Sequence, residues 1–177
     1  MKIKEPILIL LLTITACAPV QITTIQPEGT SLLGFETYDF YEIEFQSYDS
    51  LPYNKDNMDF LLNEIRKQML DKGYAISEDP DLYLNVGVVV KLYEQTRETD
   101  PRFDMNYIGQ RNYHWEREEI VVGKYEVGTV IIDFVDAENN QLVWQATAVG
   151  ILTSDMEKMR ERASNAIEKI FKKMPLY

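Results

Sequence analysis

Four stretches of the chain alternate apolar with polar residues, the period of two that is typical of β-strands. The clearest is 81–93, in which every second residue is apolar and the intervening positions are mixed. The apolar face is made of Leu82, Leu84, Val86, Val88, Val90 and Leu92. Strands over 125–136 and 141–150 are joined by turn residues and predict a hairpin. A weaker alternation over 35–45 predicts an earlier strand.

Two other stretches carry apolar residues at the spacing of an amphipathic helix. The first covers 56–72. Asp56 or Asn57 can cap its start, and Gly73 suits a left-handed cap at its end. Its apolar stripe is Met58, Leu61, Leu62, Ile65, Met69 and Leu70.

The second helix follows Ser154 and Glu157, which have the spacing of a capping box, and Pro175 stops it. Its apolar face is made of Met156, Met159, Ala163, Ile167, Ile170, Phe171 and Met174. Each helix has one apolar side, which we expect to lie against a sheet.

The elements follow the order strand, helix, strand, strand, strand, helix. Strand 81–93 has its fully apolar face on one side only, as expected of a sheet that helices cover on one side. The two strands that flank the first helix are expected to be parallel. The sequence therefore predicts a two-layer α+β domain over 32–177, with a mixed sheet of four or slightly more strands and two helices on one face.

The first sixteen residues have the three-part layout of a secretory signal peptide. Lys2 and Lys4 are followed by an apolar run over 7–14 and then by small residues. That run is much shorter than the roughly 20 residues that a membrane-spanning helix needs. We therefore expect residues 1–16 to be a cleaved signal peptide and not a permanent membrane helix.

Residues 14–17 resemble the bacterial lipobox, in which a diacylglycerol is attached to the cysteine and cleavage makes that cysteine the new N-terminus. Two or three acyl chains on Cys17 would anchor the protein firmly, because one chain alone binds a bilayer only marginally. The alternative is an ordinary signal peptide with a free or buried thiol. Residues 17–31 are expected to form a lipidated tether, with an edge strand over 20–25 as the other interpretation.

The chain carries 29 acidic and 18 basic residues, a formal charge of −11. Such a field repels phosphate backbones and anionic headgroups, so nucleic acid is not expected as a partner. Cys17 is the only cysteine, which excludes internal disulfides and multi-cysteine zinc sites. No dinucleotide-binding or phosphate-binding glycine motif is present, and we expect no cofactor.

The sequence contains no evident catalytic constellation. His114 is the only histidine, which excludes a multi-histidine metal site, and no Gly-x-Ser-x-Gly turn marks a nucleophile. A Ser-His-Asp triad assembled from distant positions stays open, but a histidine in a surface loop is the simpler interpretation. Asp133 and Asp136 lack the spacing of a calcium loop and are interpreted as structural, with Asp133 facing solvent. We expect no enzymatic activity and no metal site.

Residues 94–123 form an unusually long connection between two strands. Aromatic residues occur there among arginines, and long loops that carry aromatic side chains are candidate contact surfaces. The candidate contact residues, for a protein or glycan of the cell envelope, are Tyr107, Tyr113 and Trp115. The alternative is that the rings of this segment cover the free sheet face beside Tyr83 and Tyr93.

Three groups of residues, taken with the lipobox, resemble a bacterial lipoprotein family. They are Thr37-Tyr38-Asp39-Phe40; Lys72-Gly73-Tyr74 followed by Asp79-Pro80-Asp81-Leu82; and Tyr125-Glu126-Val127-Gly128-Thr129 with Ile132-Asp133-Phe134-Val135-Asp136 and Leu142-Val143-Trp144-Gln145-Ala146. Together they resemble the family of domain of unknown function 4136. The resemblance implies an exported, lipid-anchored α+β domain and no particular reaction. By analogy with such lipoproteins we expect a position in the outer membrane, facing the periplasm.

Three functions agree with these observations. The leading hypothesis is a non-enzymatic binding or structural module of the cell envelope, held near the membrane by its lipid. The second is an envelope hydrolase with a site that is not visible in the sequence. The third is a carrier for an apolar ligand, which would need a cavity of at least ~300 Å³ between helices and sheet.

Lipidation of Cys17 can be tested with labelled palmitate. We expect the wild-type protein to incorporate the label and Cys17→Ser to lose it, because the serine hydroxyl does not replace the thiol as acceptor. The measurement is label per protein after purification from growing bacteria. Equal labelling of the two proteins would contradict the lipobox interpretation.

Overall fold

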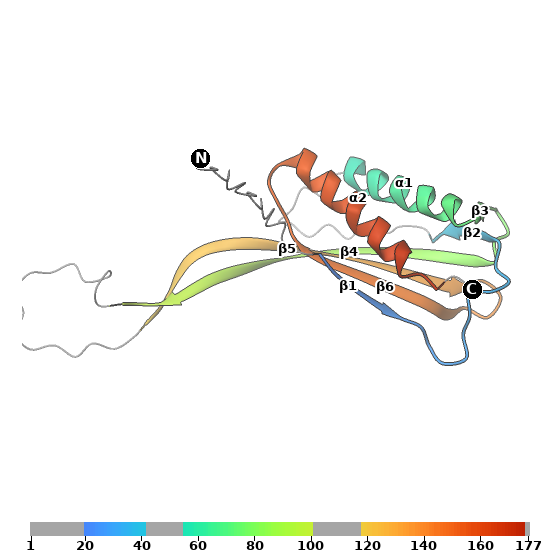
Figure 1. The fold of residues 1–177 in the computed structure, drawn as a ribbon, viewed down its shortest axis with the longest axis horizontal. Coiled ribbons are helices and arrows are strands. Elements are labelled where there is room, and N and C mark those ends of the chain that lie inside the picture. The colour runs from blue at the N-terminus through green and yellow to red at the C-terminus, as the bar shows by residue number, and fades with distance from the viewer. Residues whose placement is uncertain (1–19, 42–54, 101–117, 176–177) are drawn as a thin grey trace, which may run out of the picture.

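The computed structural model describes residues 20–41, 55–100 and 118–175. Within these ranges six strands form one mixed sheet, and two helices lie side by side on one face of it (Figure 1). The elements are β1 (Gln21–Ile25), β2 (Thr37–Phe40), α1 (Lys55–Asp71), β3 (Ala75–Ile76), β4 (Leu82–Glu98), β5 (Glu119–Asp136), β6 (Gln141–Ile151) and α2 (Met156–Lys172). The predicted two-layer α+β architecture is confirmed.

The number and order of strands differ from the prediction. The strand order in the sheet is β1-β6-β5-β4-β2-β3, so two short edge strands, β1 and β3, add to the four that were expected. β1 pairs antiparallel with β6, and residues 21–25 therefore belong to the sheet and not to a tether. β3 has only two residues, too few to show a period of two. The parallel pairing of β2 with β4 is confirmed, as is the β5–β6 hairpin.

β4 and β5 are longer than their sequence pattern indicated. Their pairing runs from Leu82 opposite Asp136 to Glu98 opposite Glu119, with a shift in register after Gln95. β6 ends at Ile151, so the outer part of this pair continues beyond the helices as a two-stranded ribbon (Figure 1). The connection between the strands is consequently shorter than the expected 94–123.

The core lies between the helices and the apolar face of the sheet. Phe134 packs edge-to-face against Trp144, with ring centroids 5.0 Å apart, and against Phe171 at 6.2 Å. On α1 the predicted stripe is buried at Met58, Leu62, Ile65 and Met69. The prediction is wrong for Leu70, which is 71% exposed, because adjacent helical residues point about 100° apart and Met69 already faces the sheet.

The ends of the helices were predicted with mixed success. Gly73 has a φ of +91° and forms the expected C-terminal cap of α1. α1 begins at Lys55, so Asp56 lies inside its first turn and is not the cap.

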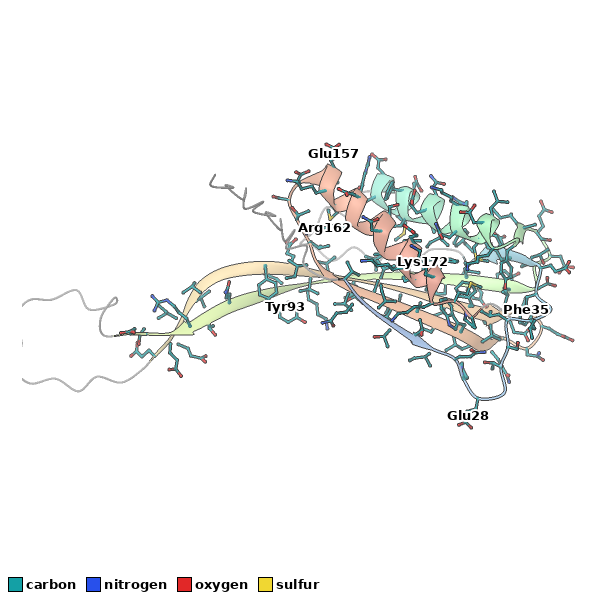
Figure 2. The ribbon with its side chains drawn as sticks, viewed as in Figure 1. Glu28, Phe35, Tyr93, Glu157, Arg162 and Lys172 are labelled. Carbon is teal, nitrogen blue, oxygen red and sulfur yellow. The ribbon has the colours of Figure 1, made fainter. Side chains whose placement is uncertain are left out.

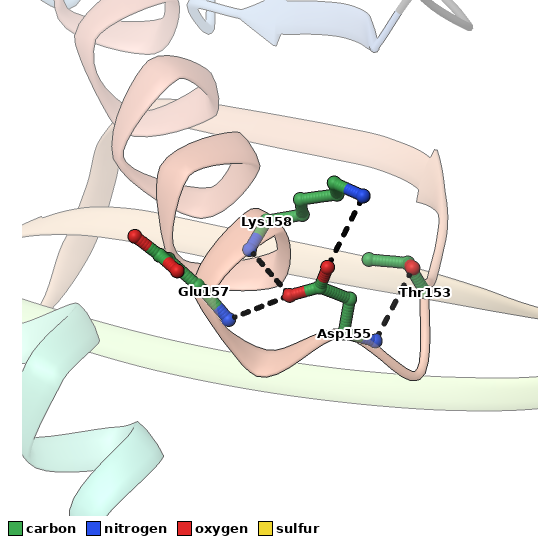
Figure 3. Close-up of polar contacts among 4 residues, drawn as sticks. All are labelled: Thr153, Asp155, Glu157 and Lys158. Carbon is green, nitrogen blue, oxygen red and sulfur yellow. Dashed lines mark hydrogen bonds and ion pairs between the residues drawn. The ribbon is translucent and has the colours of Figure 1, made fainter.

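The N-cap of α2 is Asp155 and not Ser154 (Figure 3). Its Oδ1 accepts hydrogen bonds from the backbone N–H groups of Lys158 and Glu157, both at 3.2 Å. The pKa of Asp155 lies below its ordinary value. The largest cause is the backbone hydrogen bond from Lys158, and the second is the hydrogen bond from the Lys158 side chain. An aspartate one residue further along thus satisfies the N–H groups that Ser154 was expected to satisfy.

Asp81 ties the start of β4 to the start of β2. Its Oδ2 accepts hydrogen bonds from the backbone N–H groups of Glu36 and Thr37, at 2.9 and 2.8 Å, and from the Thr37 hydroxyl at 2.8 Å. The Asp81 N–H donates back to the same hydroxyl at 2.9 Å. The two backbone hydrogen bonds, with a smaller part from the hydroxyl, lower the pKa of Asp81.

Replacing Asp81 with alanine should lower the free energy of unfolding at pH 7 by about 1–2 kcal/mol, because three hydrogen bonds to an exposed carboxylate are lost. The folded-state pKa of Asp81 is lowered, so its stabilisation is complete above the unfolded pKa of about 3.9 and disappears as the pH falls through the folded value. Urea unfolding from pH 7 to pH 3 measures this. Asp79→Ala, which removes a nearby carboxylate without touching these hydrogen bonds, is the matched control. A deficit in Asp81→Ala that stays constant across the pH range would contradict this origin.

Candidate functional site

A groove of about 750 Å³ lies between the N-terminal turns of both helices and the part of the sheet from which the ribbon departs. The helices contribute Asn57, Met58, Phe60 and Leu61 from α1 and Met156, Met159, Arg160, Arg162, Ala163 and Ala166 from α2. The strands contribute Val88, Val90 and Leu92 from β4, Lys124, Tyr125, Glu126, Gly128 and Val130 from β5, and Ala148, Gly150 and Ile151 from β6. Val20 and residues 152–154 complete the lining.

The groove opens because the side chains on the helix-facing side of the sheet become smaller from row to row. Paired residues of β4, β5 and β6 define these rows. From the closed end toward the groove they are Leu84, Phe134 and Trp144; Val86, Ile132 and Ala146; Val88, Val130 and Ala148; and Val90, Gly128 and Gly150. Large side chains fill the space under the helices at one end. At the other end the strands carry no side chain at Gly128 and Gly150, and Leu152 and Val20 from neighbouring segments lie over these two positions.

The apolar face of β4 continues beyond the cover that the helices provide. Its exposed fraction rises from 0% at Leu84 through 6% at Val86 to 61% at Leu92. Because the alternation of apolar residues does not change along this strand, the gradient reflects the position of the helices and not the composition of the strand. The result is an apolar floor that is accessible from outside.

The apolar face of α2 likewise has a buried part and an exposed part. Ile167 and Phe171 are buried in the core, whereas Met156 is 42% exposed and lines the groove together with Met159. The prediction of one buried stripe along α2 is therefore right for its C-terminal half and wrong for its first turns.

Cationic side chains gather around this apolar surface. Arg162 lies on the side of α2 that faces the strands, and its Nη1 donates a hydrogen bond to the carbonyl of Ile151 at 3.4 Å (Figure 2). The guanidinium of Arg160 lies 5.5 Å from the centroid of the Phe60 ring. Lys124 also lines the groove but forms an ion pair with Glu94. Glu126 adds one carboxylate to the same lining, and Arg160 and Arg162 are the cations there that could meet an anionic group.

The end of the groove depends on a close approach of two segments at Gly128. A Cβ atom at that position would lie 2.7 Å from Cδ2 of Leu152. The N–H of Leu152 donates to the carbonyl of Glu126 at 2.9 Å, which fixes the connection between β6 and α2 against β5. Glycine at 128 thus lets this connection close the end of the groove.

The site residues predicted from the sequence cannot be compared with this geometry. Cys17, His114 and the candidate contact residues Tyr107, Tyr113 and Trp115 lie outside the described residues. In the described part of the chain, Tyr93 stacks on Tyr125 with centroids 5.7 Å apart, on the ribbon beyond the helices (Figure 2).

The two aspartates interpreted as structural do have structural partners. Asp133 accepts a hydrogen bond from Gln145 Nε2 at 2.7 Å, on the sheet face that the helices leave free. Asp136 accepts hydrogen bonds in the β5–β6 turn, and the bond from the Asn139 side chain is the main cause of its lowered pKa.

Across residues 20–41, 55–100 and 118–175, no three His, Cys, Asp or Glu side chains are grouped as metal ligands. Neither α1 nor α2 has the length and apolar character required to cross a bilayer.

The apolar-carrier hypothesis required a cavity between helices and sheet, and a groove lies there. Its place along the sheet and its lining were not predicted, although the sequence holds a signal for them. Gly128 and Gly150 fall on the apolar face of two adjacent strands, while the apolar alternation of β4 continues to Leu92. Small residues opposite an uninterrupted apolar strand indicate a depression in the sheet surface. Recognising it required the register of three strands, which the sequence does not provide.

The shape of the sheet surface predicts opposite effects of added volume at its two ends. Gly150→Leu should leave stability unchanged or raise it, because the nearest atom to an added Cβ is Val20 Cγ2 at 3.5 Å and the groove lies beyond. Ala146→Leu should lower the free energy of unfolding by about 1–3 kcal/mol, because Ala146 is 0% exposed and the core there is full. Urea unfolding of both variants tests this, and the reverse order would show that the groove does not exist in solution.

Comparisons with solved structures found distant similarity over most of the chain. A PDZ domain protein from Parabacteroides distasonis is 14% identical, with a TM-score of 0.49 over 90% of this chain and 36% of its own. The chain thus spans about a third of that protein's length. The PelC dodecamer subunit from Paraburkholderia phytofirmans is 13% identical, with a TM-score of 0.44 over 86% of this chain and 94% of its own. Protein XCC0632 from Xanthomonas campestris is 12% identical, with a TM-score of 0.40 over 87% of both chains.

The comparison with curated proteins found no match. The sequence pattern of one family, the domain of unknown function DUF4136, matches residues 23–176. This match begins within β1 and covers both helices and every other strand of the sheet, and it confirms the resemblance seen in the sequence. The protein belongs to the DUF4136 family.

Proposed function

We propose that this protein is a non-enzymatic binding protein of the bacterial envelope whose groove receives the hydrocarbon chain of an anionic amphiphile. A lipid on Cys17 would anchor it to the outer membrane, on the periplasmic side. The observation that carries the proposal is the apolar groove between the helices and the sheet. Its volume of about 750 Å³ exceeds the ~300 Å³ that a carrier for an apolar ligand needs.

The floor of the groove suits a flexible chain of methylene groups. Val88, Val90 and Val130 supply branched apolar contacts, and Leu152 and Val20 add apolar side chains beside the two glycines. Each buried methylene contributes about 0.8 kcal/mol, so ten would contribute about 8 kcal/mol. Association costs an estimated 4–15 kcal/mol, so the apolar contacts alone give weak binding.

A negatively charged head would supply the remaining affinity. Arg160 and Arg162 line the groove from the first turns of α2, where the helix dipole also favours negative charge. Asp155 already satisfies two N–H groups of that helix end, so the arginine side chains and not the backbone are the proposed partners of the head. A fatty acid or a singly charged lipid fits this arrangement.

The contact surface of Tyr107, Tyr113 and Trp115 remains a sequence prediction within the same proposal. These residues belong to the segment that connects the outer ends of β4 and β5.

Calorimetric titration of the Cys17→Ser protein with laurate tests whether the groove binds an anionic amphiphile. Val90→Trp should weaken binding at least tenfold, because the indole would occupy the floor. Val89→Trp is the matched control: Val89 is 43% exposed, faces the other side of the sheet and should leave binding unchanged. Absence of laurate binding, or equal loss in both variants, would contradict the proposal.

A second comparison separates the roles of the chain and the head. Arg160→Gln with Arg162→Gln should weaken laurate binding while leaving the binding of uncharged dodecanol nearly unchanged. Equal effects on both ligands would mean that the arginines act through packing and not through charge.

A further inference from the structure

We propose that the groove holds one acyl chain of the lipid on the protein's own Cys17, so that this chain exchanges between the groove and the bilayer. The inference rests on the part of the proposed function in which the groove receives a hydrocarbon chain. An acylated cysteine has no anionic head, so Arg160 and Arg162 would hold only the competing amphiphiles. The inference requires that the lipid reaches the groove, fits into it and competes with other amphiphiles.

The direction of β1 brings the N-terminal segment to the groove. β1 is antiparallel to β6, with Gln21 opposite Val149, so the chain before Gln21 leaves the sheet beside Gly150. Val20 itself lines the groove, and its Cγ2 would lie 3.5 Å from a Cβ at Gly150. Two residues, Ala18 and Pro19, lie between Cys17 and Val20, and the three Cα–Cα steps span at most about 11 Å when the chain is extended. An acyl chain on Cys17 therefore starts within its own length of the groove.

The volume of the groove is large enough for one acyl chain. A methylene group is similar in size to a water molecule, whose share of liquid volume is about 30 Å³. A chain of about sixteen carbons therefore needs about 500 Å³ by the same measure, less than the 750 Å³ of the groove. The inference places one chain in the groove and leaves the remaining acyl groups in the membrane.

The short connection favours the attached lipid over a free one. A ligand on a short flexible linker has an effective concentration in the millimolar range. A free amphiphile of similar intrinsic affinity would have to reach that concentration to displace it. Moving one chain into the groove would also leave fewer chains in the bilayer, and a single chain anchors only marginally. The groove would thus adjust how firmly the protein is held.

Photochemical cross-linking within the lipidated protein tests this inference. A photoreactive fatty acid fed to the bacteria labels the lipid on Cys17, and the processed protein is placed in vesicles of phosphatidylethanolamine and phosphatidylglycerol. After irradiation we expect mass spectrometry to find links to groove residues such as Val90 and Met159. These links should fall at least tenfold in Val90→Trp and in excess laurate, and stay unchanged in Val89→Trp.

Several results would overturn the inference. Links only to membrane lipid, or a protein without acyl label, exclude an acyl chain in the groove. Mixing light and isotopically heavy protein before irradiation shows whether a link joins two copies. Links between light and heavy chains would mean that the groove holds the lipid of a neighbouring copy. If the Cys17→Ser protein binds laurate but no internal link forms, this inference fails alone. If laurate does not bind, the proposed function fails.

Discussion

The difference in rise between a helix and a strand determines the shape of this domain. α1, α2 and β4 each contain 17 residues. At about 1.5 Å per helical residue and 3.3 Å per strand residue, each helix spans about 25 Å and β4 about 56 Å. Two helices that pack over one end of the sheet therefore cannot cover the apolar face of β4 along its whole length. The uncovered part becomes first the floor of a groove and then one side of the ribbon.

The closed end of the sheet gives this open surface a fixed position. Trp144, Phe134 and Phe171 pack there through edge-to-face contacts, and Phe171 ties α2 to the sheet. Because the groove continues the same strands and helices, most of its walls belong to regular elements, and Val20 and residues 152–154 complete them. A surface built in this way is formed before a ligand arrives, which lowers the entropy cost of binding.

The edge strand β1 links this surface to the N-terminal part of the chain. It adds to the sheet beside β6, and Lys173 Nζ at the end of α2 donates a hydrogen bond to the Ile22 carbonyl at 2.7 Å. This pairing fixes where the chain before Val20 leaves the domain. In our proposals, it also brings an attached lipid near an apolar surface that suits one acyl chain. Anchoring and binding would then be two uses of the same hydrocarbon.

Local patterns in the sequence determined most of the elements. Alternation along 81–93 fixed the face of β4, the spacing of Met58, Leu62 and Ile65 fixed the buried side of α1, and Gly73 fixed its end. These predictions succeeded because each depends on neighbours within a few residues. β1 could not be assigned with certainty, since five residues with mixed polarity become a strand only when β6 lies beside them.

The groove and the fate of each apolar side chain depended on tertiary structure. Leu84 and Leu92 occupy equivalent positions in one alternating pattern, yet one is fully buried and the other mostly exposed. The sequence determined that both point to the same side of the sheet, because side-chain direction follows from the backbone of the strand itself. Only the packed structure decided which of them the helices cover, because that depends on helix length and on the register that places Gly128 and Gly150 side by side.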